Sequence, residues 1–249
     1  MDFTIEKYKA LLSALLKQQY HFQTFSDFLL SPKERSIILR HDVDLLPFNS
    51  LAFAKIQSEN KVKCSYYFRA VPESWNENVI QEISSLGHEI GYHYECLTTC
   101  NGNMENAIID FELNLSRLRK LAPVSTICMH GSPMSKWDSK DLWKHNKYQD
   151  YDIIGEPYFD VDFQKVFYLT DTGRRWDGEK VSVRDKVNSG SILTFHTTQQ
   201  IIKAADMGQL PNQIMFTCHP QRWTDNKLKW GKEIVVQNLK NQVKRFLIK

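Results

Sequence analysis

After Pro32 the chain alternates between short apolar segments and longer amphipathic stretches, and this alternation constrains the fold more than any other feature. The composition of the short segments favours strands at 36–40, 62–68, 88–93, 124–129, 153–155, 166–169 and 213–218, while 192–195 is ambiguous. The spacing of apolar residues predicts helices at 47–60, 77–86, 104–118, 138–145 and 232–247. Strand–helix alternation with short connections predicts an α/β fold with a parallel sheet, closed or open.

The sequence predicts a single domain. Its 249 residues are 42% hydrophobic and 24% charged, which is typical of a globular protein, and no linker rich in Pro, Gly or Ser divides it. Between Ile5 and Leu16 the apolar residues share one helical face. We therefore expect a single domain over 1–249, in which 1–30 is an N-terminal helical extension packed on the outside.

Charge, cysteine usage and the N-terminus limit the partners and the compartment. The net charge of +3 is too small to indicate nucleic-acid binding. The N-terminus lacks a basic region followed by an apolar run, no segment is apolar enough to span a bilayer, and the five cysteines are odd in number and scattered. We expect reduced thiols and a cytoplasmic location. The basic C-terminal helix should pack on the domain, and weak peripheral contact with anionic lipid is the alternative. The lysines on its polar face are Lys232, Lys240, Lys244 and Lys249.

Polar side chains gather where the expected strands end. Asp42 and Asp44 follow the segment 36–40, and residues two apart in extended chain point the same way. Two adjacent carboxylates repel each other unless a cation or a shared proton relieves them. His93, His130 and His219 end three other strands, and Pro220 fixes the backbone after His219.

These carboxylates and imidazoles are candidate metal ligands because the carboxyl ends of parallel strands meet at one edge of a sheet. Oxygen and imidazole ligands without thiolates suit Zn²⁺, and also accept Co²⁺, Ni²⁺ or Mn²⁺. His88 begins its strand and should therefore be structural.

Four motifs in this order resemble those of the polysaccharide deacetylase family, also called carbohydrate esterase family four or the chitooligosaccharide deacetylase homology group. They are RHDVD at 40–44, GHEIGYH at 87–93, HGSP at 130–133 and TCHPQRW at 217–223. The resemblance runs from about Ile37 to Trp223 and is strongest to a bacterial subgroup associated with surface-polysaccharide gene clusters. It implies a distorted (β/α) barrel of about seven parallel strands. It also implies hydrolysis of N-acetyl, and sometimes O-acetyl, groups on sugars with one divalent metal ion.

By position, the resemblance makes Asp42 the catalytic base, Asp44 and His93 metal ligands, and His219 the general acid. Two departures from the family pattern stand out. Leu97 occupies the position of the usual second metal histidine, and the HGSP motif stands where an arginine usually orients the base. We expect His130 to supply the third ligand, with Glu95 as the competing candidate. We expect Arg175 to take over the orienting arginine's role, although a surface turn would explain Arg174 and Arg175 equally well.

Loop tryptophans are candidates for stacking on sugar rings. Trp176 and Trp223 lie near strand ends and are the stronger candidates for substrate contact, together with the region of Tyr94, where a backbone N–H should hold the oxyanion. The expected substrate is a sugar, a nucleotide sugar or a lipid-linked or polymeric saccharide. Two alternatives remain open: a carbohydrate-binding pseudoenzyme on the same fold, and a metal-dependent hydrolase of a non-sugar amide.

Overall fold

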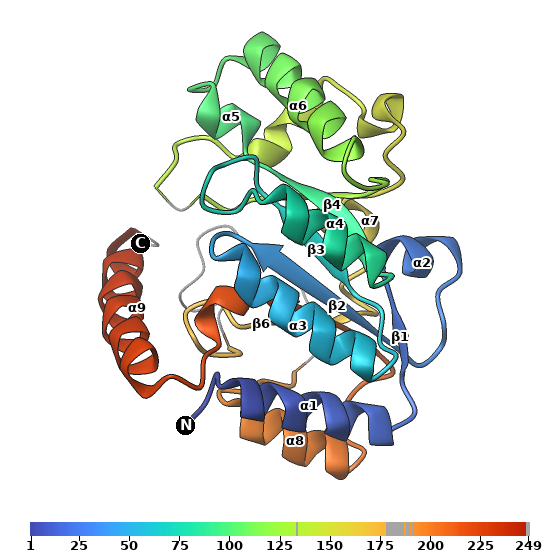
Figure 1. Ribbon diagram of the computed structural model, residues 1–249, viewed down its shortest axis with the longest axis vertical. Coiled ribbons are helices and arrows are strands. Elements are labelled where there is room, and N and C mark those ends of the chain that lie inside the picture. The colour runs from blue at the N-terminus through green and yellow to red at the C-terminus, as the bar shows by residue number, and fades with distance from the viewer. Residues whose placement is uncertain (133, 178–186, 188–189, 191, 248–249) are drawn as a thin grey trace.

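A seven-stranded parallel sheet forms the centre of the protein (Figure 1). The computed structural model describes residues 1–132, 134–177, 187, 190 and 192–247, with side chains up to Gln242 in the last helix. Along the sheet the order is β5-β4-β3-β2-β7-β6, and β1 also pairs with β2. The strands are β1 (His21–Gln23), β2 (Ser36–Val43), β3 (Ser65–Phe68), β4 (Glu89–Tyr94), β5 (Ile127–Met129), β6 (Phe167–Thr170) and β7 (Gln213–Cys218). No pairing joins β5 to β6 within the described residues, so the sheet is curled but open there.

Helices follow most strands, as expected for an α/β fold. They are α1 (Ile5–Lys17), α2 (Phe25–Leu30), α3 (Pro47–Glu59), α4 (Glu77–Ser85), α5 (Cys96–Thr99), α6 (Met104–Arg119), α7 (Pro157–Asp160), α8 (Thr198–Asp206) and α9 (Lys227–Leu247). Short 3-10 turns occur at η1 (Ser139–Lys144), η2 (Tyr148–Tyr151) and η4 (Pro220–Arg222). Local sequence sets several helix starts: Asn76 caps α4, Thr197 forms a capping box with Gln200, and Pro47 opens α3.

Side-chain alternation along the strands separates two hydrophobic cores. On β2, Ile37 and Leu39 belong to the large core between the sheet and its helices, whereas Ile38 belongs to a smaller core inside the curl. Tyr67 of β3 lies in the same inner core, and its ring passes so close to Gly91 that a Cβ there would meet it at 2.3 Å. By the same alternation, even-numbered residues of β2 and odd-numbered residues of β4 face the interior of the curl. This places Asp42 and His93 on one concave surface.

Several expected elements differ from those observed. His21–Gln23 forms a strand that pairs in parallel with β2, so the stretch 1–30 adds a strand to the sheet besides its helices. Three residues are too few to show a strand periodicity in sequence. The expected strand at 153–155 is reduced to a single bridge between Thr126 and Gly155, and residues 192–195 form no strand. The expected helix at 138–145 is the 3-10 turn η1.

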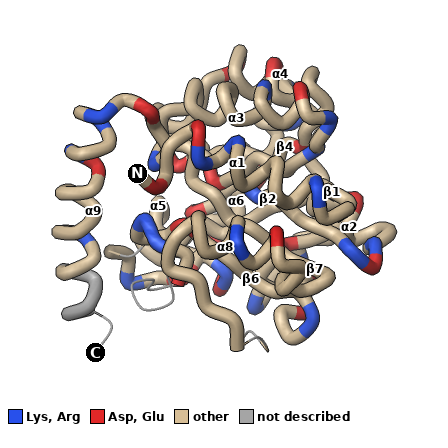
Figure 2. Tube along the Cα trace, turned by 90° about the horizontal axis from the view of Figure 1, so that it is seen from below, with Lys and Arg blue, Asp and Glu red and all other residues tan. Residues whose placement is uncertain are grey.

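The last helix, α9, stands at the margin of the molecule, near the N-terminus (Figures 1 and 2). The helix packs on the domain as expected, but its apolar residues Val235 and Leu239 are exposed. Gln237 and Asn241 face the domain instead and are buried. Asn241 Nδ2 donates to the Gly173 carbonyl oxygen at 3.1 Å, which joins this face to the domain. Within the described part of the chain, no helix is long and apolar enough to cross a membrane.

Candidate metal centre

Asp42 lies inside the curl of the sheet and is held by an arginine from its own strand. Arg40 Nε and Nη2 donate to the two oxygens of Asp42 at 2.8 and 2.6 Å. Both residues are buried, Arg40 with 1% and Asp42 with 3% of its surface exposed. Burial by itself would raise the pKa of Asp42, but Arg40 and then His93 outweigh it and lower that pKa to about 2. Asp42 is therefore a fixed carboxylate at neutral pH.

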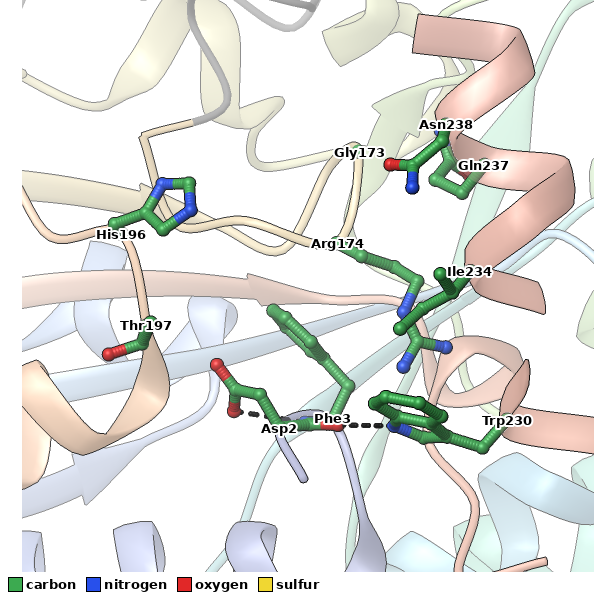
Figure 3. Close-up of a pocket in the computed structure, with 10 residues that line it drawn as sticks. All are labelled: Asp2, Phe3, Gly173, Arg174, His196, Thr197, Trp230, Ile234, Gln237 and Asn238. Atoms are coloured by element: carbon green, nitrogen blue, oxygen red, sulfur yellow. Dashed lines mark hydrogen bonds between the residues drawn. The ribbon is translucent and has the colours of Figure 1, made fainter. Parts of the chain in front are cut away.

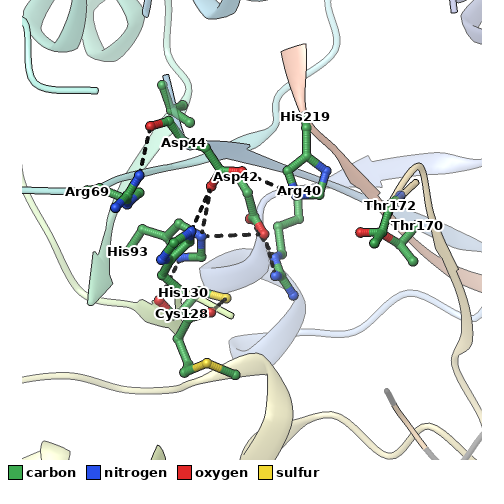
Figure 4. A network of polar contacts seen from close by, with 12 residues as sticks. Arg40, Asp42, Asp44, Arg69, His93, Cys128, His130, Thr170, Thr172 and His219 are labelled. Carbon is green, nitrogen blue, oxygen red and sulfur yellow. Dashed lines mark hydrogen bonds and ion pairs between the residues drawn. The ribbon is translucent and has the colours of Figure 1, made fainter. Parts of the chain in front are cut away.

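Asp44 follows β2 and is surrounded by three imidazoles (Figure 4). Its Oδ1 lies 3.6 Å from His93 Nε2 and 3.5 Å from His130 Nε2, and its Oδ2 lies 3.8 Å from His219 Nε2. Asp44 Oδ2 also accepts a hydrogen bond from Gln221 Nε2 at 3.1 Å. Asp44 Oδ1 is buried and has no hydrogen-bond partner among the residues that the structure describes. A buried carboxylate oxygen that faces two imidazole nitrogens without a hydrogen bond is what a cation site requires.

The two nearest histidines are oriented by acceptors behind them. His93 Nδ1 lies 2.8 Å from the Cys128 carbonyl oxygen, and His130 Nδ1 lies 2.9 Å from Glu95 Oε2. Because each acceptor requires a proton on Nδ1, each Nε2 presents its lone pair toward Asp44. Histidines that bind metals are held in this way, with a carboxylate or a carbonyl on the far nitrogen.

Glu95 is thus the support of a candidate ligand rather than a member of the ligand set. Arg69 fixes it, since Arg69 Nη2 and Nε lie 2.6 and 2.8 Å from Glu95 Oε1. Arg69 also donates to the Asp44 carbonyl oxygen at 3.2 Å. Burial would raise the pKa of Glu95, but His130 and Arg69 lower it to about 2. Glu95 is therefore a carboxylate at neutral pH, held by Arg69 on one side and in contact with His130 Nδ1 on the other.

Asp44, His93 and His130 offer ligand atoms that all lie within 4.8 Å of one another. Two imidazoles and a carboxylate, with room for one more ligand, are the donor set of catalytic zinc sites. The side chains of Asp44 and His130 keep 18% and 17% of their surface exposed, whereas His93 is buried. An ion held here would be open to solvent on one side. Leu97 is buried in the outer core and lies on α5, whereas His130 directly follows β5.

His219 is held by a buried carboxylate that sequence reasoning missed. Asp171 Oδ1 lies 2.5 Å from His219 Nδ1, and Asp171 Oδ2 accepts from the His219 backbone N–H at 2.9 Å. Asp171 also accepts from Trp223 Nε1 at 2.7 Å and from Arg222 Nη1 at 3.1 Å. Burial would raise the pKa of Asp171, but His219 and Arg222 lower it. This pair leaves His219 Nε2 pointing to the Asp44 side of the site.

The arginine beside the expected base is Arg40 and not Arg175. Arg175 forms its own bidentate pair with Asp177, with both N···O distances 2.6 Å. Arg40 could have been found from the sequence, because it stands two residues before Asp42 and so shares its face of β2. Asp171 offered a similar signal, as the first polar residue after β6, but its partner His219 is 48 positions away in the chain.

The aromatic side chains that were expected to contact the substrate are buried in the structure. Trp176 is 3% and Trp223 1% exposed, and both pack against Phe3. Their indole N–H groups donate to Thr198 and Asp171, respectively. The Tyr94 ring is fully buried on the outer side of the sheet, where its hydroxyl accepts from Trp143 Nε1. These three rings are therefore core residues and do not present a face to a sugar.

One further group of donors lies beneath the site. Ligand atoms of Asp42, His93 and Cys128 also fall within 4.8 Å of one another, all from buried side chains. Arg40 already occupies both oxygens of Asp42, and the Cys128 thiol contacts the Met129 carbonyl oxygen. The more open set around Asp44 is therefore the better ion site. His88, by contrast, contacts the Cys64 N–H and the Ala54 carbonyl oxygen and is structural as expected.

Comparisons with known proteins give matches only among solved structures. No protein-family model and no curated protein matches the chain. A mutant of a CE4 family pseudoenzyme from Bacillus anthracis is 13% identical, with 85% of this chain and 64% of that chain covered and a TM-score of 0.45. The Xyl-CE4 domain of a multidomain xylanase from the hindgut metagenome of Trinervitermes trinervoides is 14% identical, with 84% and 85% covered and a TM-score of 0.40.

A third solved structure is Bacillus subtilis PdaA, a family 4 carbohydrate esterase. It is 11% identical, with 92% of this chain and 83% of that chain covered and a TM-score of 0.40. This chain therefore spans less than two thirds of the pseudoenzyme and most of the other two. The identities and TM-scores are too low to assign a family or an activity to the chain.

Proposed function

We propose that this protein is a metal-dependent deacetylase that hydrolyses an acetyl group, N-acetyl in the first place, from a sugar or sugar conjugate. The observation that carries the proposal is the convergence of His93 and His130 on Oδ1 of Asp44, a buried oxygen without a hydrogen bond from the described residues. Asp42 lies on the same concave surface, 3.7 Å from His93 Nε2. The resemblance of the four sequence motifs to polysaccharide deacetylases supplies the reaction class.

Asp44, His93 and His130 would hold the ion, with Zn²⁺ as the first choice. When bound there, a divalent ion would supply Lewis-acid chemistry, lowering the pKa of a water and polarising the acetyl carbonyl. Asp42 accepts the proton of the attacking water, because Arg40 keeps it a carboxylate at neutral pH. Arg40 also fixes its orientation, since both oxygens are bound in a planar fork.

His219 acts as the acid at the end of the reaction. Asp171 binds Nδ1, so in the imidazolium form the Nε2–H of His219 faces the site, and the amine nitrogen takes that proton as the bond to the acetyl carbon breaks. The oxygen of water ends in acetate and the sugar leaves as a free amine, so atoms and charges balance. Asp171, buried and bound by Arg222 and Trp223, holds the imidazole in this orientation.

Substrate recognition must use groups other than the two buried tryptophans. The segment after Asp44 exposes Leu45, Leu46 and Phe48, with 40%, 53% and 65% of their surfaces accessible. Leu46 has φ 55°, a left-handed conformation that is costly for a leucine and often marks functional sites. An apolar rim beside the site suits the ring face or the aglycone of a saccharide. A role in bacterial surface-polysaccharide metabolism, in the cytoplasm, is the context that we propose.

The test is acetate release by the purified, zinc-loaded protein. The substrates are N-acetylglucosamine as a free sugar, linked to UDP and as a β-1,4 oligomer, with N-acetylglycine as a non-sugar amide. We expect turnover of at least one sugar and a loss of about 10²- to 10⁴-fold in Asp42→Asn, with zinc content retained. Asp44→Ala should lose both zinc and activity. Arg175→Gln is the matched control, because this arginine pairs with Asp177 and should leave turnover unchanged.

Three outcomes would count against the proposal. Full activity of Asp42→Asn would show that Asp42 is not the catalytic base. Zinc binding without turnover of any acetylated sugar would favour a carbohydrate-binding protein. Turnover of N-acetylglycine alone would make the protein a hydrolase of non-sugar amides.

A further inference from the structure

The last helix differs in charge from the rest of the chain. Residues 227–249 contain seven Lys or Arg and one Glu, a net charge of +6. The other 226 residues contain 25 Lys or Arg and 28 Asp or Glu, a net charge of −3. The basic surplus of the whole protein is therefore concentrated in α9. Figure 2 shows this helix at one side of the molecule, with several basic residues in it.

The face of α9 that meets the domain is polar. Trp230 Nε1 donates to the Asp2 carbonyl oxygen at 2.6 Å, and Asn241 Nδ2 donates to the Gly173 carbonyl oxygen. The buried Gln237 side chain donates to Asn241 Oδ1 at 2.8 Å. Figure 3 shows this side of the helix turned toward the N-terminal residues and Arg174 across a pocket. Two of these hydrogen bonds, from Trp230 and from Asn241, join this face to the domain.

The opposite face of α9 is apolar and exposed. Leu228, Val235 and Leu239 are 86%, 60% and 59% exposed, and their spacing of seven and four residues places them on one side of the helix. Lys232 lies within this stripe and Lys240 beside it, both exposed. In the sequence, Val243 and Phe246 continue the same spacing. An apolar stripe bordered by lysines is the composition of helices that lie in a membrane interface.

We propose that α9 is a membrane-surface helix, which docks its exposed apolar face into a bilayer that contains anionic lipids. The positive charge of the helix complements anionic head groups, and long lysine side chains can extend past the buried stripe to reach them. A second copy of the chain fits this face less well, because two segments of charge +6 would repel each other. The contact of Asn241 with Gly173 also puts α9 beside the loop that starts at Asp171.

Vesicle sedimentation of the full-length protein tests this inference without substrate or metal, so its outcome is separate from that of the deacetylase proposal. Vesicles of phosphatidylcholine with phosphatidylglycerol are compared with vesicles of phosphatidylcholine alone. We expect binding to the anionic vesicles only, weakening as salt is raised because charge attraction is screened. The double variant Val235→Ser/Leu239→Ser should bind the anionic vesicles at least about tenfold more weakly than the unaltered protein. Lys232→Glu/Lys240→Glu should lose binding and its salt dependence.

The matched control is Ile109→Ser/Leu113→Ser on α6. These two residues are also four apart on a helix and similarly exposed, at 63% and 59%, but they lie outside the basic segment. This variant should bind like the unaltered protein. Equal sedimentation with both kinds of vesicle, or unchanged binding after Val235→Ser/Leu239→Ser, would overturn the proposal. So would a dimer in solution that Val235→Ser/Leu239→Ser dissociates, since the stripe would then be covered by a second copy.

Discussion

The buried pair of Arg40 and Asp42 makes a quantitative prediction about stability. The two charges are joined by hydrogen bonds of 2.8 and 2.6 Å in a site with almost no solvent exposure. At an effective dielectric constant of about 20, unit charges about 4 Å apart interact by about 4 kcal/mol. Removing one partner leaves the other buried and uncompensated, which costs about 3–5 kcal/mol.

A double-mutant cycle measures this interaction directly. Arg40→Met and Asp42→Asn should each lower the free energy of unfolding by about 3–5 kcal/mol, because each leaves one buried polar partner behind. The double variant should lose less than the sum of the two by about 2–3 kcal/mol, since neither charge remains. Urea unfolding at pH 7 with a chelator present gives these values without a contribution from bound metal.

The control for the cycle is Arg175→Met, which breaks a similar bidentate pair whose side chains are 17% and 11% exposed. Solvent screening should limit its cost to about 1 kcal/mol. The reasoning is refuted if Arg40→Met is no more destabilising than Arg175→Met, or if the two substitutions at positions 40 and 42 are additive.

Further predictions concern the supporting residues of the site. Glu95→Gln should weaken zinc binding by about 10- to 100-fold in a chelator competition, because His130 loses the carboxylate that orients it. The pKa of Glu95 is about 2 in the folded protein, below its usual 4.5, so its contribution to stability is complete above about pH 5 and is lost as the pH falls toward 2. Thermal unfolding of the metal-free protein should therefore depend less on acid pH in Glu95→Gln, and equal slopes would contradict this. Asp171→Asn should lower kcat by about 10²-fold or more with little change in KM, because His219 is no longer held for proton transfer; a change in KM alone would argue against that role. Trp176→Phe should leave KM unchanged while Trp176→Ala destabilises the fold by about 3–5 kcal/mol, and a selective rise of KM in the Phe variant would restore the sugar-stacking interpretation.

Much of the site could be predicted from sequence because its residues follow strands. The strand at 36–40 was recognised, and the polar residues that end β2, β4 and β7 could be placed at one edge of a parallel sheet. Asp44, His93 and His130 do meet there. The strand β2 runs further than expected, to Val43, so Asp42 is a residue of the strand itself. Arg40 and Asp42 therefore share one face of the strand, a relation that a strand ending at residue 40 does not predict.

The remaining residues depend on contacts that local sequence does not encode. Asp171 meets His219 through the pairing of β6 with β7, and the two strands are separated by a long stretch of chain. Trp176 and Trp223 follow strand ends, as expected of loop residues, yet the N-terminal Phe3 covers both. The outward direction of the apolar face of α9 could not be predicted from the sequence either. A 3.6-residue period shows that a helix has an apolar face but not where that face points.

The measurement that tests the account most directly is a crystal structure of the zinc-soaked protein, with anomalous data collected at the zinc edge. We expect one ion bound by Asp44 Oδ1, His93 Nε2 and His130 Nε2 at about 2.0–2.2 Å. An ion bound elsewhere, or one that Glu95 or Cys128 binds in place of His130, would contradict the proposed metal centre.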